Sequence, residues 1–349
     1  MPKFGDEPYY DLFLSVLAAQ TAIGTELALY SHQEIYMMTR PAETLRPTDR
    51  IGRLNRATLA KTVTIEGTGI HTGEKGQIVL KPAEAGTGLI FKGTGSRIGD
   101  IPVSPFYAQD GVQAVTLGNR HWQIKTVEHL LCAMAAAGVS DCIMETTMSE
   151  VPILDGSSLP FYEKLMEGGI QELDEPMEPL KLSNPVWVIE NDRYVVALPS
   201  DEFKVTYTID YPHPMLRGQT LTMGLNADNL IDDILPARTF GFLKDVEELR
   251  KRGLIQGGSL DNAVVLTEDG YLNDDLRFED ECIRHKILDL VGDLYLLGRP
   301  LKAHIVAFRA GHSLDISLGK KIQTRIAMDE LASRKDRIQS AEKVSASPV

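Results

Sequence analysis

Apolar and polar residues alternate along several short stretches of the chain, and a period of two is typical of half-buried β-strands. These stretches are 57–66, 186–198, 204–210 and 303–309, with a further buried strand predicted at 142–146. Longer stretches that are rich in Leu, Met and Ala, or that repeat apolar residues three and four positions apart, predict helices. They are 127–138, which Gly138 ends, 160–168 and 278–297. The pattern therefore predicts an α+β protein in which strands are followed by helices, twice over.

A charged, proline-bearing segment divides this pattern into two halves. Residues 174–179 read D-E-P-M-E-P, the composition of an interdomain linker. A chain of 349 residues also exceeds the usual size of a single hydrophobic core. We therefore expect a first domain at 57–175 and a second at 180–325, similar in size and element order, and a C-terminal tail at 326–349.

Residues 1–56 differ from the rest, since an apolar helix candidate is followed by a stretch rich in proline and arginine. We expect an N-terminal extension that is partly disordered, binds a partner, or is untranslated because Met37 or Met38 is the true initiator. Its apolar run at 12–24 is interrupted by polar residues and preceded by acidic ones. A signal peptide begins with basic residues, and a spanning helix needs about 20 apolar residues. We therefore expect a cytoplasmic protein without an integral membrane segment.

The composition narrows the range of partners. The chain holds 49 acidic against 36 basic residues, a net charge of −13, which disfavours a nucleic-acid partner. If the substrate is an anion, a few basic residues near the site must offset this background, and Lys286 and Arg238 are candidates. The three cysteines, Cys132, Cys142 and Cys282, lack C-x-x-C spacing, so we expect no disulfide framework and a reducing compartment.

The predicted helix at 278–297 carries a polar stripe at positions i, i+4 and i+8, formed by His285, Asp289 and Asp293. Phe, Cys and Leu residues flank the stripe, which is unusual for a solvated helix face. A histidine and a carboxylate one turn apart can bind a single metal ion, and the stripe would then face a partly buried cleft. On this motif alone, a surface His and Asp pair without metal is the better-supported alternative.

Two further motifs add the remaining chemistry of a hydrolytic metal centre. In T-V-E-H at 126–129, His129 could ligate an ion while Glu128 points elsewhere and reaches a water on the same ion. By itself, a Glu favoured at a helix N-terminus beside an ordinary His explains this motif better. His312 follows a predicted strand in A-G-H, a position that suits a site residue as well as an exposed one. The three motifs together favour a shared site.

Other segments allow more than one interpretation. R-T-F-G-F at 238–242 offers a guanidinium, a hydroxyl and two aromatic rings, which could stack on a base, line an apolar channel or pack in the core. The glycine-rich segments are 67–73, which contains His71, and 253–258. No G-K-[ST] follows either of them, so a nucleotide hydrolase of the P-loop type is disfavoured.

With these motifs the chain resembles the UDP-3-O-acyl-N-acetylglucosamine deacetylases, metal-dependent enzymes of lipid A biosynthesis in Gram-negative bacteria. The resemblance runs from about residue 57 to about residue 323. Its motifs are G-I-H-T-G at 69–73, T-V-E-H-L at 126–130, E-V-P-I-L-D-G-S at 150–157, R-T-F-G-F at 238–242, L-R-F-E-D-E at 276–281, R-H-K-I-L-D-L-V-G-D at 284–293 and A-G-H at 310–312. So many matches in the right order make a chance agreement improbable.

The resemblance implies a role for each matching residue. His129, His285 and Asp289 would be the zinc ligands, although ferrous iron also suits such a set. Glu128 would be the general base. His312 would be the protonated partner that gives a proton to the leaving amine, with Asp293 holding it charged and Thr239 contacting the tetrahedral intermediate. The residues expected to bind substrate are Lys286, Phe240, His71, Phe242, Val246, Ile255 and Val265.

The resemblance also implies a fold of two similar layered β-α-α-β sandwich domains with the active site at their interface. An insert near 242–265 would form a passage for the acyl chain. The expected reaction releases acetate from UDP-3-O-acyl-N-acetylglucosamine, in a monomeric protein. Two alternatives stay open: an amidohydrolase of the same architecture with another acylated substrate, and a silent protein that senses UDP-acyl-sugars. The intact set of acid, base and ligands disfavours the second.

Overall fold

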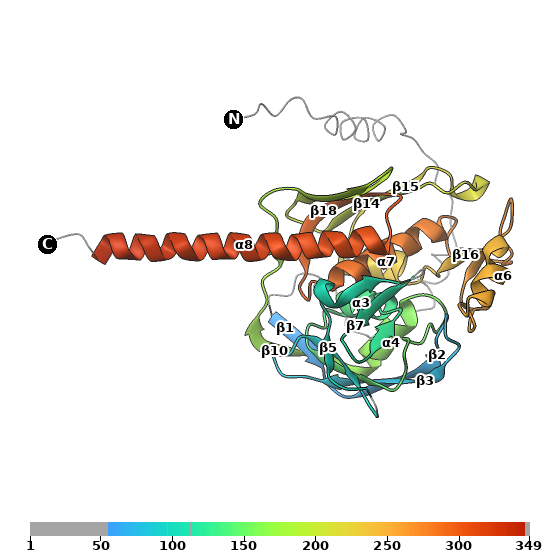
Figure 1. Ribbon diagram of the computed structural model, residues 1–349, viewed down its shortest axis with the longest axis horizontal. Helices are drawn as coiled ribbons and strands as arrows, with labels where there is room; N and C mark the ends of the chain where they lie inside the picture. The colour runs from blue at the N-terminus through green and yellow to red at the C-terminus, as the bar shows by residue number, and fades with distance from the viewer. Residues whose placement is uncertain (1–54, 96, 112–113, 346–349) are drawn as a thin grey trace. The chain divides into compact units, whose positions relative to one another are not determined.

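The computed structural model describes residues 55–95, 97–111 and 114–345 (Figure 1). Two sheets form the outer layers, and helices lie between them. This arrangement confirms the predicted α+β class and its β-α-α-β layering. The predicted extension at 1–56 lies outside the described residues, apart from Asn55 and Arg56, which begin the first strand.

The first half of the chain forms one of these sheets and two helices. The strand order is β2 (Val63–Thr68), β3 (Lys75–Pro82), β9 (Cys142–Thr146), β4 (Leu89–Gly93) and β5 (Asp100–Pro102). The helices, which pack against each other, are α3 (Glu128–Ala137) and α4 (Leu159–Gly168). A three-stranded sheet contains β6 (Ala108–Asp110), β7 (Val115–Gly118) and β8 (Gln123–Lys125), after the short helix η1 (Pro105–Tyr107). Outside these sheets, β1 (Asn55–Leu59) pairs antiparallel with β10 (Ile170–Pro176).

The second half forms the other sheet and its helices. The strand order is β12 (Val186–Glu190), β13 (Arg193–Pro199), β18 (Leu301–Phe308), β14 (Lys204–Ile209) and β15 (Gln219–Gly224), and β11 (Leu180–Lys181) also pairs with β18. The main helices are α7 (Glu281–Tyr295) and α8 (His312–Ser345). The short helix η2 (Pro214–Leu216) lies between β14 and β15. Between β15 and α7 lie α5 (Ala227–Asn229), the π-helix η3 (Leu230–Ile234), β16 (Phe240–Phe242), α6 (Leu243–Lys251) and β17 (Val264–Leu266). Strands β16 and β17 pair in parallel.

The two main sheets share one topology. In each, two antiparallel hairpins flank a central strand that comes last in the chain. That strand is antiparallel to one neighbour and parallel to the other. In each, one helix precedes the central strand and one follows it: α3 and α4 around β9, and α7 and α8 around β18. The expected repetition of element order therefore extends to the strand pairing.

Helices α3 and α7 make the most extensive contact between the two halves, and they lie side by side in Figure 1. Every residue of α7 except Arg284 is buried, because the helix is covered by α3, α8 and the second sheet. Gly292 allows a close approach of the two backbones, since a Cβ there would lie 2.2 Å from the carbonyl oxygen of Glu128. The two helices that carry the predicted ligands are thus held face to face.

Some boundaries differ from expectation. The stretch 57–66 is two strands, β1 and β2, separated by a bend at 60–62, because the alternation continues across the break. Residues 174–176 of the predicted linker belong to β10, whose exposed polar side chains give no sign of its pairing with β1. The predicted helix at 278–297 begins at Glu281 and ends at Tyr295. Up to Ser345, the predicted tail at 326–349 continues α8, whose apolar residues favour no single face.

The structure also bears on the predicted cysteine chemistry and on membrane insertion. Cys132, Cys142 and Cys282 are all buried and free, which confirms that no disulfide framework is present. Among the helices of the described ranges, none combines the length and the apolar character that crossing a membrane requires.

Candidate metal centre

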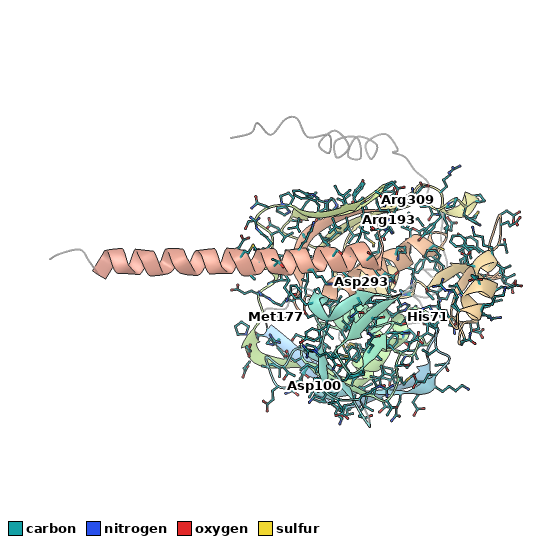
Figure 2. The ribbon with its side chains drawn as sticks, in the orientation of Figure 1. His71, Asp100, Met177, Arg193, Asp293 and Arg309 are labelled. Carbon is teal, nitrogen blue, oxygen red and sulfur yellow. The ribbon has the colours of Figure 1, made fainter. Side chains whose placement is uncertain are left out.

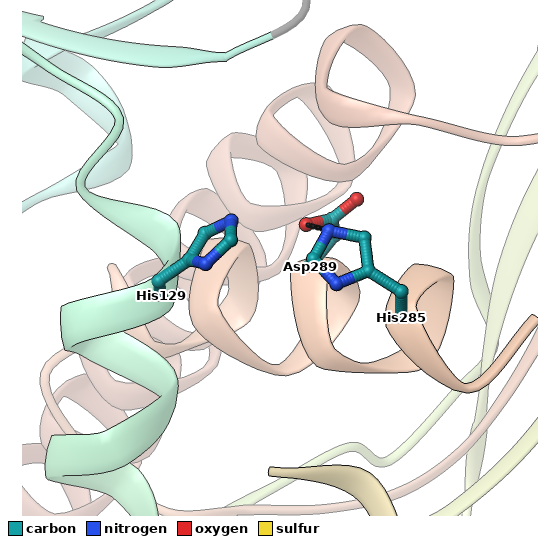
Figure 3. A group of neighbouring side chains, drawn as sticks. All are labelled: His129, His285 and Asp289. Carbon is teal, nitrogen blue, oxygen red and sulfur yellow. Dashed lines mark ion pairs between the residues drawn. The ribbon is translucent and has the colours of Figure 1, made fainter. Parts of the chain in front are cut away.

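Two helices bring the three predicted ligands together. His129 lies on the first turn of α3, while His285 and Asp289 lie one turn apart on α7. Their ligand atoms all lie within 4.8 Å of one another, and all three side chains are buried. Figure 3 shows His129 reaching from α3 toward the pair on α7. The contact between the two helices therefore creates a group of three side chains that could hold a metal ion.

The chemistry of these donors suits a zinc ion. The Nδ1–H of His285 can donate to the carbonyl oxygen of Ala237 at 3.0 Å, which leaves Nε2, 3.3 Å from an oxygen of Asp289, free to ligate. Burial and the neighbouring His285 lower the pKa of His129 to about 3, so its ring is neutral at pH 7. Burial alone would raise the pKa of Asp289, but the charge of Lys286 holds it well below its usual range. Two imidazoles and a carboxylate form a typical zinc-binding set with a position open for water or substrate.

A buried glutamate and a largely buried histidine lie beside the ligand group. Burial raises the pKa of Glu128 to about 8, although His312 opposes the rise. The Nε2 atom of His312 lies 3.9 Å from an oxygen of Glu128 and 4.0 Å from an oxygen of Asp289, and its Nδ1 lies 2.7 Å from Asp293. Burial alone would lower the pKa of His312, but Asp293 outweighs it and the pKa rises to about 10. At neutral pH the imidazolium of His312 therefore faces the carboxyl group of Glu128.

A strained residue and a buried carboxylate fix the start of α3. Thr126 has φ 57°, in the left-handed region that a β-branched residue rarely adopts. Its hydroxyl donates to Glu150 at 2.9 Å, and its backbone N–H donates to Val115. The same carboxylate accepts hydrogen bonds from the backbone N–H groups of His71 and Thr72. Glu150 thus links the segment 69–73 to the residues just before α3. Its place in the sequence did not reveal this role.

A cavity of about 450 Å³ opens onto this group. Its lining includes Glu128, His312 and all three predicted ligands. Every residue predicted to contact substrate or the intermediate also lines it: Thr239, Lys286, Phe240, His71, Phe242, Val246, Ile255 and Val265. Asp293, labelled with His71 in Figure 2, is not part of the lining and contacts His312 instead. Further apolar lining that the sequence did not indicate comes from Ile70, Leu249, Leu260 and Leu272.

The two basic candidates differ in their surroundings. The ammonium of Lys286 donates to Asp289 at 2.7 Å and the residue lines the cavity. Arg238 does not fit the expectation of a cation that faces an anionic substrate, because its guanidinium pairs with the buried carboxylate of Glu281. Asp315 was not anticipated, since the start of α8 was not predicted as a helix. It is fully buried one turn after His312, and burial raises its pKa well above the usual range.

Comparison with known proteins decides the family. The sequence profile of the UDP-3-O-acyl N-acetylglycosamine deacetylases matches residues 56–324. The chain belongs to this family. It is 54% identical to the UDP-3-O-acyl-N-acetylglucosamine deacetylase of Leptospira biflexa serovar Patoc (strain Patoc 1 / Ames). The two sequences align over 288 residues, which are 81% of this chain and 95% of the relative.

Two more distant relatives carry the same name. The protein of Pseudomonas entomophila (strain L48) is 41% identical over 273 residues, 77% of this chain and 90% of its own length. That of Myxococcus xanthus (strain DK1622) is 40% identical over 272 residues, 77% of this chain and 87% of its own length. Membership confirms the predicted resemblance, the fold class and the class of enzyme, a hydrolase of an amide bond. The metal dependence of the family agrees with the buried His and Asp group.

Proposed function

We propose that the chain hydrolyses the N-acetyl group of UDP-3-O-acyl-N-acetylglucosamine, releasing acetate and leaving UDP-3-O-acyl-glucosamine for lipid A biosynthesis. The observation that carries this proposal is the meeting of three ligands, a buried glutamate and a charged histidine in one largely apolar cavity. The names of the relatives support the choice of substrate.

His129, His285 and Asp289 would hold the metal, with zinc as the first candidate and ferrous iron as the second. When bound, the ion would polarise the amide carbonyl and lower the pKa of a water molecule. Glu128 lies next to His129 in sequence and lines the same cavity, so its carboxylate can accept the proton of the attacking water.

His312 supplies the second proton transfer. Its Nε2 atom faces the ligand group, and its Nδ1 atom is held by Asp293 at 2.7 Å. The water oxygen adds to the amide carbon, and the imidazolium of His312 stabilises the oxygen that becomes negative. The same group then gives its proton to the amine nitrogen as the C–N bond breaks, and acetate leaves. Acid and base are separate residues of different charge, as this sequence of transfers requires.

The cavity also suits the two ends of the substrate. Lys286 places a cation beside the ligand group, where it can contact the anionic UDP-sugar, and Phe240 offers an aromatic ring nearby. Thr239 also lines the cavity and can donate a hydrogen bond to the tetrahedral intermediate. The apolar side chains of the insert, among them Val246 and Val265, can take the acyl chain.

The test is detection of both products by mass spectrometry after incubation of the purified protein with UDP-3-O-acyl-N-acetylglucosamine. Product that disappears after chelation and returns with added zinc supports the substrate, the reaction and the metal together. A folded, zinc-loaded protein that releases no acetate would refute the proposed substrate, and a panel of other acylated amides would then distinguish another amidohydrolase from a silent binding protein.

A further inference from the structure

The segment 235–239 is linked by hydrogen bonds to the predicted ligands on both α7 and α3. The carbonyl oxygen of Ala237 accepts a hydrogen bond from Nδ1 of His285 at 3.0 Å. The carbonyl oxygen of Leu235, the first residue of the segment, accepts a hydrogen bond from the backbone N–H of Ser158 at 2.9 Å. The hydroxyl of Ser158 in turn donates to the carbonyl oxygen of His129 at 2.9 Å. One short segment is thus linked to the ligand on α7 and, through Ser158, to the ligand on α3.

A buried carboxylate holds this segment in place. One oxygen of Glu281 accepts from the backbone N–H of Arg238 at 3.0 Å and from its Nε at 2.8 Å. The other accepts from Nη2 of Arg238 at 3.1 Å and from the backbone N–H of Arg277 at 2.8 Å. Glu281 lies one turn before His285 on α7, while Arg238 follows Ala237. The same helix therefore carries the ligand and the anchor of the carbonyl that orients it.

A buried ion pair can serve stability alone, and the chain offers a matched pair for comparison. Arg56 binds Asp141 through Nε at 2.8 Å and Nη2 at 2.7 Å. The two pairs are similarly buried, since Asp141 and Glu281 expose 0% of their side chains and Arg56 and Arg238 expose 16% and 11%. The other hydrogen bonds of the Asp141 carboxylate come from the hydroxyl of Ser140 and the backbone N–H of Gly88, which lie outside the metal centre. If both pairs served stability alone, loss of either carboxylate would have the same effect on metal binding.

We propose that Glu281 and Arg238 are positioning residues of the metal centre: their buried ion pair fixes the 235–239 segment, whose Ala237 carbonyl sets the tautomer and orientation of His285. The proposal rests on the metal site of the proposed function. A carbonyl that holds Nδ1–H presents Nε2 of the ring to the ion in one orientation. When the carboxylate is lost the segment is freer, and the ion must order the ring at a cost in affinity.

The experiment compares Glu281→Gln with the matched control Asp141→Asn and with the wild-type protein. Zinc dissociation constants are measured by competition with a chelator, and the visible spectrum of the Co²⁺-substituted proteins reports the ligand geometry. We expect Glu281→Gln to raise the zinc dissociation constant by about 10- to 100-fold and to change the Co²⁺ spectrum. Asp141→Asn should leave both unchanged. Glu281→Gln protein that matches the wild type in affinity and spectrum would overturn the proposal.

A second variant covers the case in which Glu281→Gln does not fold. The double variant Arg238→Met with Glu281→Leu removes both charges, a change that buried ion pairs often tolerate without loss of stability. If this folded protein binds zinc weakly, the positioning role is supported, and if it binds like the wild type, that role is refuted. Failure of the proposed function has a different signature, because wild-type protein and His285→Ala protein would then bind zinc equally.

Discussion

Gly292→Ala is expected to damage the metal centre through the backbone of α3. The added Cβ would lie 2.2 Å from the carbonyl oxygen and 2.8 Å from the carbonyl carbon of Glu128. Real Cβ contacts are essentially never shorter than 3.0 Å, so the two helices must separate by at least about 0.8 Å. No rotamer change relieves the clash, because the atoms in contact are backbone. Glu128 and His129 would move with α3, away from His285 and Asp289 on α7.

The size of the effect follows from this displacement. A misplacement of about 1 Å can lower a rate about 100-fold, so we expect kcat/KM for deacetylation to fall by about that factor. Zinc binding should weaken as well, since ligand distances tolerate only about 0.2 Å. Overpacking costs roughly 1–3 kcal/mol, partly offset by the roughly 1 kcal/mol that Ala gains over Gly within a helix. The protein should therefore fold with a modest loss in the free energy of unfolding.

Gly319→Ala is the matched control, because Gly319 also lies inside a helix. Its added Cβ would meet only the side chain of Pro105, at 3.3 Å, which can shift by a few tenths of an ångström. The assays are acetate release, zinc affinity and urea unfolding for the three proteins. We expect Gly319→Ala to keep wild-type kinetics and zinc affinity. Wild-type kcat/KM and zinc affinity in folded Gly292→Ala protein would refute the argument from helix separation.

Three further predictions concern the base, the cavity and the pH dependence of stability. Glu128→Gln should retain zinc by metal analysis and lose about 10²- to 10⁴-fold in turnover, whereas His129→Ala should lose the metal, and an active Glu128→Gln protein would exclude the base assignment. Val246→Asp places a charge in the apolar lining and should raise KM for a long-chain substrate more than for a short-chain one, so equal KM changes would argue against an acyl passage here. Asp141→Asn should lower the free energy of unfolding by roughly 3 kcal/mol at pH 7. Burial raises the pKa of Asp141, but hydrogen bonds from Arg56, Ser140 and Gly88 outweigh it and hold the pKa below the usual 3.8. Its stabilisation is therefore complete above about pH 4 and lost as the pH falls through the folded pKa, so the difference between the two proteins in urea unfolding should be constant from about pH 5 to 7 and shrink below about pH 4. A difference that does not shrink as the pH falls below about 4 would contradict this.

The motifs in the sequence were sufficient to name the side chains that the fold brings together at the candidate site. His285, Asp289 and Asp293 form a stripe at helical spacing, and a stripe of this kind needs no tertiary information to be recognised. Glu128 and His129 are adjacent, so their different directions follow from helix geometry. The fold class followed in the same way, since alternation and helical periodicity are local properties of the chain.

The supporting residues could not be predicted, because their roles depend on contacts across the fold. Glu150 and Thr126 are separated by 24 positions, and Glu281 and Arg238 by 43. A charged side chain has the same appearance in a sequence whether it faces solvent or is buried against a partner. For this reason Arg238 was expected to face an anion, although its guanidinium pairs with Glu281. The strand β10 and the helix α8 were missed for a related reason, as their polar residues carry no period that marks a buried face.

By itself the sequence determined which residue types are present and in which local geometry: a histidine and an aspartate one helical turn apart, a glutamate next to a second histidine, and a third histidine after a strand. Only the tertiary structure decided that these groups share one site, because the packing of α3 against α7 at Gly292 brings together residues that lie far apart in the chain. Burial within that contact also set their charges, raising the pKa of Glu128 and letting Asp293 keep His312 protonated. Desolvation and charge pairing act through space, so no local pattern of residues could have established them.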